Sequence, residues 1–476
     1  MNKLTQRLSP LLVAMLLVAC STVPELKQPQ VDVPQAFKEV QAPDGTQWKP
    51  AQPAEAQARG QWWLAFDDST LTSLIDEATR ANASLAVAAA RVKQARAIAG
   101  ITDASRGVQL GVGIGGQRGR ASAVSLGLPE GTDVAATTSY QAALTASYEV
   151  DLFGRLAAGS SASQADAQAS EATYKSVLLA LQADVAQTWF RLRAANAELE
   201  TLNRTVDLRT QSVKVNQSRY DNGDIGEFDL ARARTELATA KAEAIGVQRK
   251  RTQNEHALAV LLGKPASSFT AQDKPLADAA QLPAIPAGLP SKLLERRPDI
   301  TAAQLAMTAS NARIGVAKSA MFPALALTGS GGGESASLSD VFRWSSRSWV
   351  LGALMSMPIL DGGRNKANIA RSEAVLEESV AAYRQSVLVA FAEVEDNLAG
   401  LRILAGQAEQ IDAAVVSARR SADLAQKLYD AGRSSYLDLL DAQRNLSAIE
   451  RNAVLLRGDR AVTTVALIRS LGGGWD

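Results

Sequence analysis

The chain contains one structural unit written twice, and this repeat constrains its fold more than any other feature. Residues 217–233 reappear as residues 426–442, and the matching positions keep one constant offset. These positions include Tyr220 and Tyr429, Gly223 and Gly432, Asp229 and Asp438, and Leu237 and Leu446. Two copies of one supersecondary unit give a pseudo-symmetric protomer, which suits a wall or a ring better than an active-site cleft.

Residues 1–19 have the features of an export signal. Lys3 and Arg7 precede a short apolar run that cannot span a bilayer as a helix. Cys20 follows Leu-Val-Ala, which resembles the bacterial lipobox, so we expect lipid attachment at Cys20. The alternative is a cysteine that follows an ordinary signal peptide by chance. Because Cys20 is the only cysteine, no disulfide framework is possible. Residues 20–66, rich in proline, are expected to form a lipidated extended segment.

Each repeat contains two segments in which apolar and polar residues alternate, the pattern of a half-exposed strand. Each segment is about 9–11 residues long, which is what a tilted strand needs to cross a bilayer. The expected strands are about 107–117 and 139–149 in the first repeat (67–263), and about 323–331 and 348–357 in the second (291–476). We expect the run Gly331–Gly333 to form an extracellular loop. A soluble hairpin alternates in the same way, but four such strands flanked by polar loops favour a membrane sheet.

A long helical hairpin follows each strand pair, over residues 154–262 and 363–471. Apolar residues recur every seven positions, at Leu178, Val185, Leu192, Leu199, Val206, Val213 and Tyr220 and again in the second copy. A heptad pattern of this length predicts left-handed coiled-coil packing, and the first helix of each hairpin should span about 100 Å. Residues 264–290 are rich in proline and are expected to link the two repeats.

No catalytic, metal or nucleic-acid site is expected. His256 is the only histidine, and it lies on a polar helical stretch, so neither a zinc site nor a Cys–His pair can form. The formal net charge is +1, and no basic patch of the kind that binds nucleic acid is present. We therefore expect a protein that is not an enzyme and has no cofactor.

Four motifs together resemble the TolC-like outer-membrane efflux family, in its OprM-like lipoprotein branch. They lie at Trp62–Asp68, Tyr148–Arg155, Leu294–Ile300 and Ser470–Trp475. The resemblance implies an α+β membrane protein that forms a homotrimer. It also implies a twelve-stranded transmembrane β-barrel with four strands per protomer, and a long periplasmic α-helical coiled-coil barrel built from the two internal repeats.

The resemblance further implies the outer membrane of a Gram-negative bacterium as the location and a passive exit duct as the function. The duct would receive small toxic compounds from an inner-membrane pump of the resistance-nodulation-division type and from a periplasmic adaptor. A periplasmic adaptor lipoprotein is the alternative. It fits less well, because an adaptor carries one helical hairpin inside β domains and this chain has two hairpins with paired strands.

The turn of the second hairpin contains the most notable charges. Asp438 and Asp441 are three residues apart and so share a helix face, which in a trimer would form rings of carboxylates. The resemblance implies a periplasmic gate built from Asp438, Asp441, Asp229, Tyr429 and Arg433. The arginine of the family's gate matches Ser434 by position, and Arg433 lies one residue before it. The alternative is that these carboxylates only stabilise helix N-termini.

Overall fold

The computed structural model describes residues 22–27, 29, 32–34, 36–39, 60–277, 282–283, 285 and 296–473. The expected signal peptide and Cys20 lie outside these residues. The chain divides into two compact units. Unit 1 comprises residues 1–29, 91–170 and 302–383, and unit 2 comprises residues 30–90, 171–301 and 384–476.

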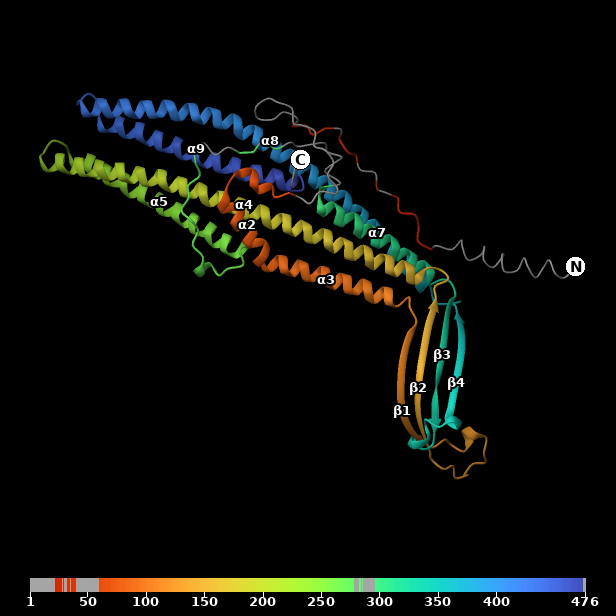
Figure 1. The fold of residues 1–476 in the computed structure, drawn as a ribbon. Coiled ribbons are helices and arrows are strands. Elements are labelled where there is room, and N and C mark those ends of the chain that lie inside the picture. The colour runs from red at the N-terminus through yellow and green to blue at the C-terminus, as the bar shows by residue number, and fades with distance from the viewer. Residues whose placement is uncertain are drawn as a thin grey trace. The chain divides into compact units, whose positions relative to one another are not determined.

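Both repeats contain, in the same order, a helix, two strands, a long helix and a return helix, and within the described ranges the first repeat has one more helix before them (Figure 1). The first contains α2 (Ser69–Ala81), α3 (Ala83–Ala104), β1 (Gln109–Gly119), β2 (Thr137–Val150), α4 (Arg155–Asp221) and α5 (Glu227–Leu261). The second contains α7 (Pro298–Ser319), β3 (Ala324–Ser335), β4 (Arg347–Ser356), α8 (Arg364–Asp430) and α9 (Tyr436–Ser470).

The internal repeat is confirmed by the lengths of its helices. Helices α4 and α8 both have 67 residues, α5 and α9 both have 35, and α3 and α7 both have 22. At 1.5 Å per residue the two longest helices each measure about 100 Å, as the heptad pattern predicted. Among the described residues, no helix combines the length and the apolar character needed to cross a membrane.

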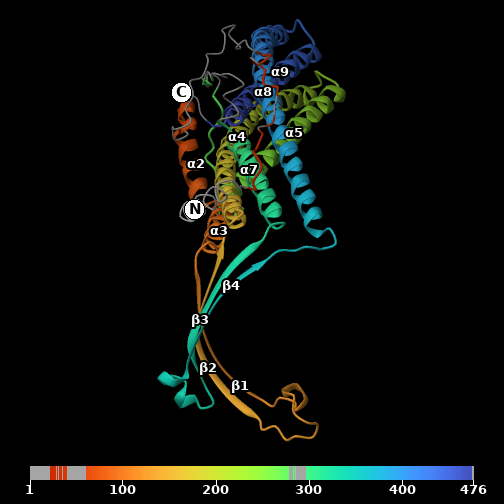
Figure 2. The same cartoon turned by 90° about the vertical axis from the view of Figure 1, so that its right-hand side faces the viewer.

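The strands of unit 1 form one antiparallel sheet in the order β1-β2-β3-β4. Figure 2 shows that the four strands twist together. The register brings the apolar positions of neighbouring strands to the same face of the sheet: Val112 lies opposite Leu144, Leu144 opposite Gly331, and Gly331 opposite Trp349. The other face carries mostly Gln, Thr, Ser, Glu and Gly, with Val350 and Leu354 on β4 as apolar exceptions. The large apolar side chains therefore lie mainly on one side of the sheet, and they are exposed, with Val112 at 75% and Trp349 at 74%.

The expectation of a loop at Gly331–Gly333 was wrong, because strand β3 continues through this run to Ser335. Two glycines of this run leave no room for a side chain, because the backbone of a neighbouring segment lies close to each of them. A Cβ atom on Gly332 would lie 2.0 Å from the carbonyl oxygen of Ala142, and one on Gly333 would lie 1.9 Å from that of Val341. Glycine here permits close approach of backbones within the strand.

In unit 2 the heptad positions of the two long helices are buried or half-buried, apart from Tyr220, which is exposed. Val185 and Leu192 on α4, and Val387 and Val394 on α8, have no exposed surface. Further along α4, Leu199 and Val206 pack against a cluster of Leu202, Ala244 and Val247, in which the last two residues come from α5. The heptad residues therefore form the helix–helix core of unit 2, as coiled-coil packing requires.

The return helices α5 and α9 each end near the first helices of their own repeat. The Asn82 side chain, at the break between α2 and α3, donates a 2.9 Å hydrogen bond to the carbonyl oxygen of Leu261 at the end of α5. In the second copy, the Arg297 guanidinium donates a 3.2 Å hydrogen bond to that of Ser470 at the end of α9. Each repeat thus satisfies an otherwise unpaired carbonyl at the end of its return helix with a polar side chain.

Gly263 follows α5 with φ +71°, and its replacement should destabilise this junction. A Cβ atom on Gly263 would lie 2.4 Å from the carbonyl oxygen of Ala81. We expect Gly263→Ala to lower the free energy of unfolding by about 1–3 kcal/mol, since it combines a left-handed backbone with a steric clash. Gly246→Ala in the middle of α5 is the matched control, because nothing lies within 4 Å of its Cβ position. That variant should be neutral or more stable by up to about 1 kcal/mol. Thermal unfolding of the purified protein compares the two.

Candidate functional site

The candidate site lies in unit 2, at the turns of the two helical hairpins. The turns have the same backbone structure, with a left-handed glycine at Gly223 (φ 79°) and at Gly432 (φ 70°). Each glycine N–H donates a 2.9 Å hydrogen bond to the carbonyl oxygen of a tyrosine three residues earlier, Tyr220 and Tyr429 respectively. This is the αL end of a helix, for which glycine is favoured.

The two turns differ in how the following helix begins. In the second turn, the Asp438 backbone N–H donates to the Ser435 hydroxyl (3.2 Å), and the Asp438 carboxylate accepts from the Ser435 N–H (3.0 Å), which forms a capping box. Hydrogen bonds from the hydroxyl and then the N–H of Ser435 lower the pKa of Asp438 below its ordinary value. In the first turn the cap is Gly226, which has no side chain, and Asp229 occupies the position that corresponds to Asp438.

Tyr429 joins the two repeats. The Arg219 guanidinium on α4 donates a 2.8 Å hydrogen bond to the Tyr429 hydroxyl on α8, and its Cζ atom lies 5.7 Å from the centre of the ring. Tyr429 also packs with Val213 against a buried cluster of Ala233, Tyr436 and Leu440. The arginine that pairs with this tyrosine therefore comes from the first repeat rather than from the turn that follows Tyr429.

A second contact between the repeats joins the return helices. The Arg444 guanidinium on α9 forms an ion pair and two hydrogen bonds with the Glu236 carboxylate on α5. The hydrogen bond from Arg444 lowers the pKa of Glu236. Arg444 also lies 3.7 Å from Asp441, whose side chain is 61% exposed. Asp441 is therefore free to face a solvent-filled space while a cation on its own helix partly balances its charge.

The side chains of the two residues after Gly432 make fewer polar contacts. Arg433 is exposed, and its side chain makes no hydrogen bond or ion pair with any residue that the structure describes. The Ser434 hydroxyl is buried and has no hydrogen-bond partner among those residues. Sequence reasoning missed Arg219 and Glu236. Arg219 could have been found from the repeat itself, because the corresponding position of the second copy is Leu428 and the arginine is thus specific to the first.

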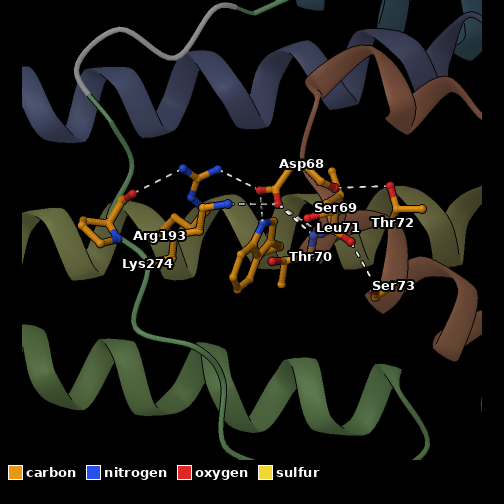
Figure 3. Close-up of polar contacts among 10 residues, drawn as sticks. Asp68, Ser69, Thr70, Leu71, Thr72, Ser73, Arg193 and Lys274 are labelled. Carbon is orange, nitrogen blue, oxygen red and sulfur yellow. Dashed lines mark hydrogen bonds and ion pairs between the residues drawn. The ribbon is translucent and has the colours of Figure 1, made fainter.

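The most buried charged cluster of unit 2 surrounds Asp68 (Figure 3). One Asp68 oxygen accepts hydrogen bonds from the Trp189 indole N–H (2.9 Å) and the Arg193 guanidinium (3.0 Å). The other oxygen lies 3.3 Å from the Lys274 ammonium and accepts from the backbone N–H groups of Thr70 and Leu71 at the start of α2. Arg193 in turn donates to the carbonyl oxygen of Pro275 at 3.3 Å.

This cluster is structural rather than catalytic. Burial alone would raise the pKa of Asp68, but the hydrogen bond from Trp189 and the charges of Lys274 and Arg193 outweigh burial and lower it. The carboxylate is therefore held ionised and fully partnered, which leaves it no capacity to accept a proton near neutral pH. Its partners come from α2, α4 and the segment after α5, so Asp68 fastens these three parts of unit 2 together.

His256 is exposed on α5. Within the described ranges, no group of three or more His, Cys, Asp or Glu side chains is placed to hold a metal ion.

Comparisons with known proteins agree on one family. The family described as "Outer membrane efflux protein" matches residues 74–264 and 289–473. The solvent efflux pump outer membrane protein SrpC of Pseudomonas putida is 34% identical over 474 residues, covering 98% of each chain. The cation efflux system protein CusC of Escherichia coli O6:H1 is 34% identical over 470 residues, covering 98% of this chain and 99% of CusC. Among solved structures, the Campylobacter jejuni CmeC outer membrane channel aligns with a TM-score of 0.89 at 25% identity, covering 96% of both chains.

Proposed function

The chain belongs to the outer membrane efflux protein family, and from this premise we propose that it is the exit channel of a tripartite efflux system. It resides in the outer membrane and passes small toxic compounds to the outside without chemical change. The family consists of channel proteins rather than enzymes. Membership in this family also decides against the alternative of a periplasmic adaptor.

The sheet carries the proposal. Most of its large apolar side chains share one face across the four strands, and within the part of the chain described no other element covers them. A hydrophobic surface of this kind is stable against lipid, with the polar face turned to water. Strands β1 and β4 also have an unpaired edge each. Because an open edge cannot be satisfied in lipid, further copies of the chain must pair with these edges.

A homotrimer meets this requirement. Four strands are too few to close around an aqueous pore, whereas three copies would supply twelve strands in one closed barrel. The helices of the three copies would then enclose a periplasmic tunnel. An inner-membrane pump of the resistance-nodulation-division type and a periplasmic adaptor would deliver the exported compound to the tips of the helical hairpins.

The lipid anchor is proposed at Cys20. The nearby Thr22 hydroxyl donates to the carbonyl oxygens of Phe153 (3.0 Å) and Gly315 (2.9 Å). Phe153 lies between the end of β2 and the start of α4, so Thr22 is held near the end of the strands. Because Cys20 is only two residues from Thr22 in the sequence, this contact supports lipid attachment to the membrane that the sheet would cross.

The proposal is tested with the purified mature protein. Native mass spectrometry in detergent should give the mass of three chains, and insertion into planar bilayers should produce stepwise ion currents. Disruption of the gene should increase the sensitivity of the host to at least one class of toxic compound. A monomer that carries no current under any condition would overturn both the trimer and the channel.

A further inference from the structure

Unit 1 contains a groove that the predicted gate does not include. It has a volume of about 570 Å³ and is lined by residues of α3, α4, α7 and α8, the four helices that flank the strands. Its apolar part includes Ile98, which is 50% exposed, and Val316. Its polar part contains Asp166, Arg313 and Arg371. The groove thus combines an apolar surface with charged groups, as small-molecule sites usually do.

The position of the N-terminal segment shows which side of the helices the groove occupies. On α7, the Asn311 amide donates a 2.8 Å hydrogen bond to the carbonyl oxygen of Pro24. One turn later, a Cβ atom on Gly315 would lie 2.4 Å from the side chain of Val23, so this face of α7 is covered by that segment. Arg313 and Val316 lie in the groove. At about 100° per residue they point away from the covered face.

The groove therefore opens to the lumen of the proposed channel, an inference that depends on the proposed function. The N-terminal segment leads to the lipid anchor and must lie on the outside of the trimer. Helices of both repeats line the groove, so it lies within one protomer and opens on the face of α7 opposite the N-terminal segment. Copies that join at the edges of the sheet would leave that face uncovered.

The charges of the groove do not cancel. Asp166 and Arg313 form an ion pair, and both side chains are about half exposed. Arg371 is exposed and has no hydrogen-bond or ion-pair partner among the described residues. The groove thus has an excess of one positive charge beside an apolar surface. An arginine in this setting attracts an anionic group such as a carboxylate or a sulfonate, two oxygens of which it can hold with two parallel hydrogen bonds.

We propose that this groove is a transit site for small organic anions, with a carboxylate or sulfonate bound by Arg371 and an apolar body against Ile98 and Val316. Three copies in the trimer would place three such sites around the lumen. The site would retain amphipathic anions briefly on their way out, and it would show no comparable affinity for cations of the same shape.

Block of the ion current tests the site. Trimers in planar bilayers of phosphatidylcholine are exposed to 1-naphthalenesulfonate or to 1-naphthylmethylammonium at equal ionic strength. The sulfonate should block wild-type channels at lower concentration than the ammonium. Arg371→Ala should raise the half-blocking concentration of the sulfonate by about tenfold, the loss expected for one charged hydrogen-bonding contact. Arg371→Glu should reverse the preference between the two probes.

Lys366→Ala is the matched control. Lys366 is an exposed cation on the same helix, but it does not line the groove. Channels of this variant should be blocked by both probes at the same concentrations as wild-type channels. Equal block of wild-type channels by both probes would overturn the site, as would normal currents in Arg371→Ala and Arg371→Glu with unchanged sulfonate block. A wild-type protein that carries no current at all would overturn the channel itself, and this site with it.

Discussion

Asp68→Ala should lower the free energy of unfolding by roughly 3–5 kcal/mol, the loss that follows when one partner of a buried ion pair is removed. The Asp68 side chain is only 4% exposed and that of Arg193 only 10%. Without the carboxylate, the Arg193 charge and the Trp189 N–H would both remain buried with one partner fewer. The start of α2 would also lose its N-cap. Thermal or guanidinium unfolding followed by circular dichroism in detergent measures the change.

Two variants separate the contributions to this loss. Asp68→Asn keeps a hydrogen-bond acceptor for Trp189 and the helix start but removes the charge, so it should cost less than alanine. Asp361→Ala removes another carboxylate that accepts N–H groups at a helix start, from Gly363 and Asn365 at 2.9 Å each. Because no buried cation depends on Asp361, its loss should be clearly smaller. An equal loss in Asp361→Ala would show that capping, not the ion pair, explains the effect.

The contribution of Asp68 should depend on pH in a defined direction. Its pKa in the folded protein lies below the ordinary value of 3.8, because the hydrogen bond from Trp189 and the charges of Lys274 and Arg193 outweigh burial. A carboxylate of this kind stabilises fully above its unfolded pKa, and the contribution disappears as pH falls through its folded pKa. The difference in stability between the wild type and Asp68→Asn should thus be constant above about pH 5 and shrink below pH 4. A difference that grows in acid would contradict this assignment.

The large features of this fold could be predicted because they depend on periodicity. The heptad pattern predicted two helices of about 100 Å, and α4 and α8 have 67 residues each. Alternation predicted four strands with one apolar face. The error at Gly331–Gly333 has a specific physical reason. A run of glycine is typical of loops, but here it permits a close backbone approach at Ala142 and Val341 that only the three-dimensional structure reveals.

The polar contacts could not be predicted in the same way. Trp189 and Arg193 are one helical turn apart on α4, but Asp68 and Lys274 are far from this pair in the sequence, so nothing in the chain indicates that all four meet. The Arg219–Tyr429 bond is a contact between the two repeats, and it lies where the copies differ. Positions at which a repeat departs from its own copy are therefore the best sequence signal for such contacts.

Replacing both Asp438 and Asp441 by alanine should increase single-channel conductance and lower the preference for cations over anions by about tenfold. This is the order expected when three copies each lose carboxylates within a few ångströms of a passing ion in water. The cation preference should fall because rings of carboxylates attract cations. Currents recorded under a salt gradient give both quantities. Unchanged conductance and selectivity would remove these residues from the gate.

Asp438 requires its own control, because it also belongs to the capping box of α9. Ser435→Ala breaks the box without a change in charge. If charge controls the throat, this variant should keep the cation preference, whereas Asp438→Asn should lose part of it. Asp229 permits the same comparison in the first repeat without the complication of a cap, since Gly226 offers no side chain there. Loss of selectivity in Ser435→Ala would assign the effect to the shape of the turn instead.

Tyr429→Phe examines how the tip is held closed rather than how it selects ions. The substitution removes the 2.8 Å hydrogen bond from Arg219 but keeps the ring that packs against Tyr436. If this bond between the repeats restrains the tip, open events should become more frequent while cation preference stays as in the wild type. Opening requires a contact that can be made or broken with a small change in free energy. The Arg219–Tyr429 bond meets this requirement, because Arg219 can exchange the hydroxyl for water at little cost. If both predictions hold, charge and restraint at the tip belong to different residues, so the two sets of variants should affect different properties of the current.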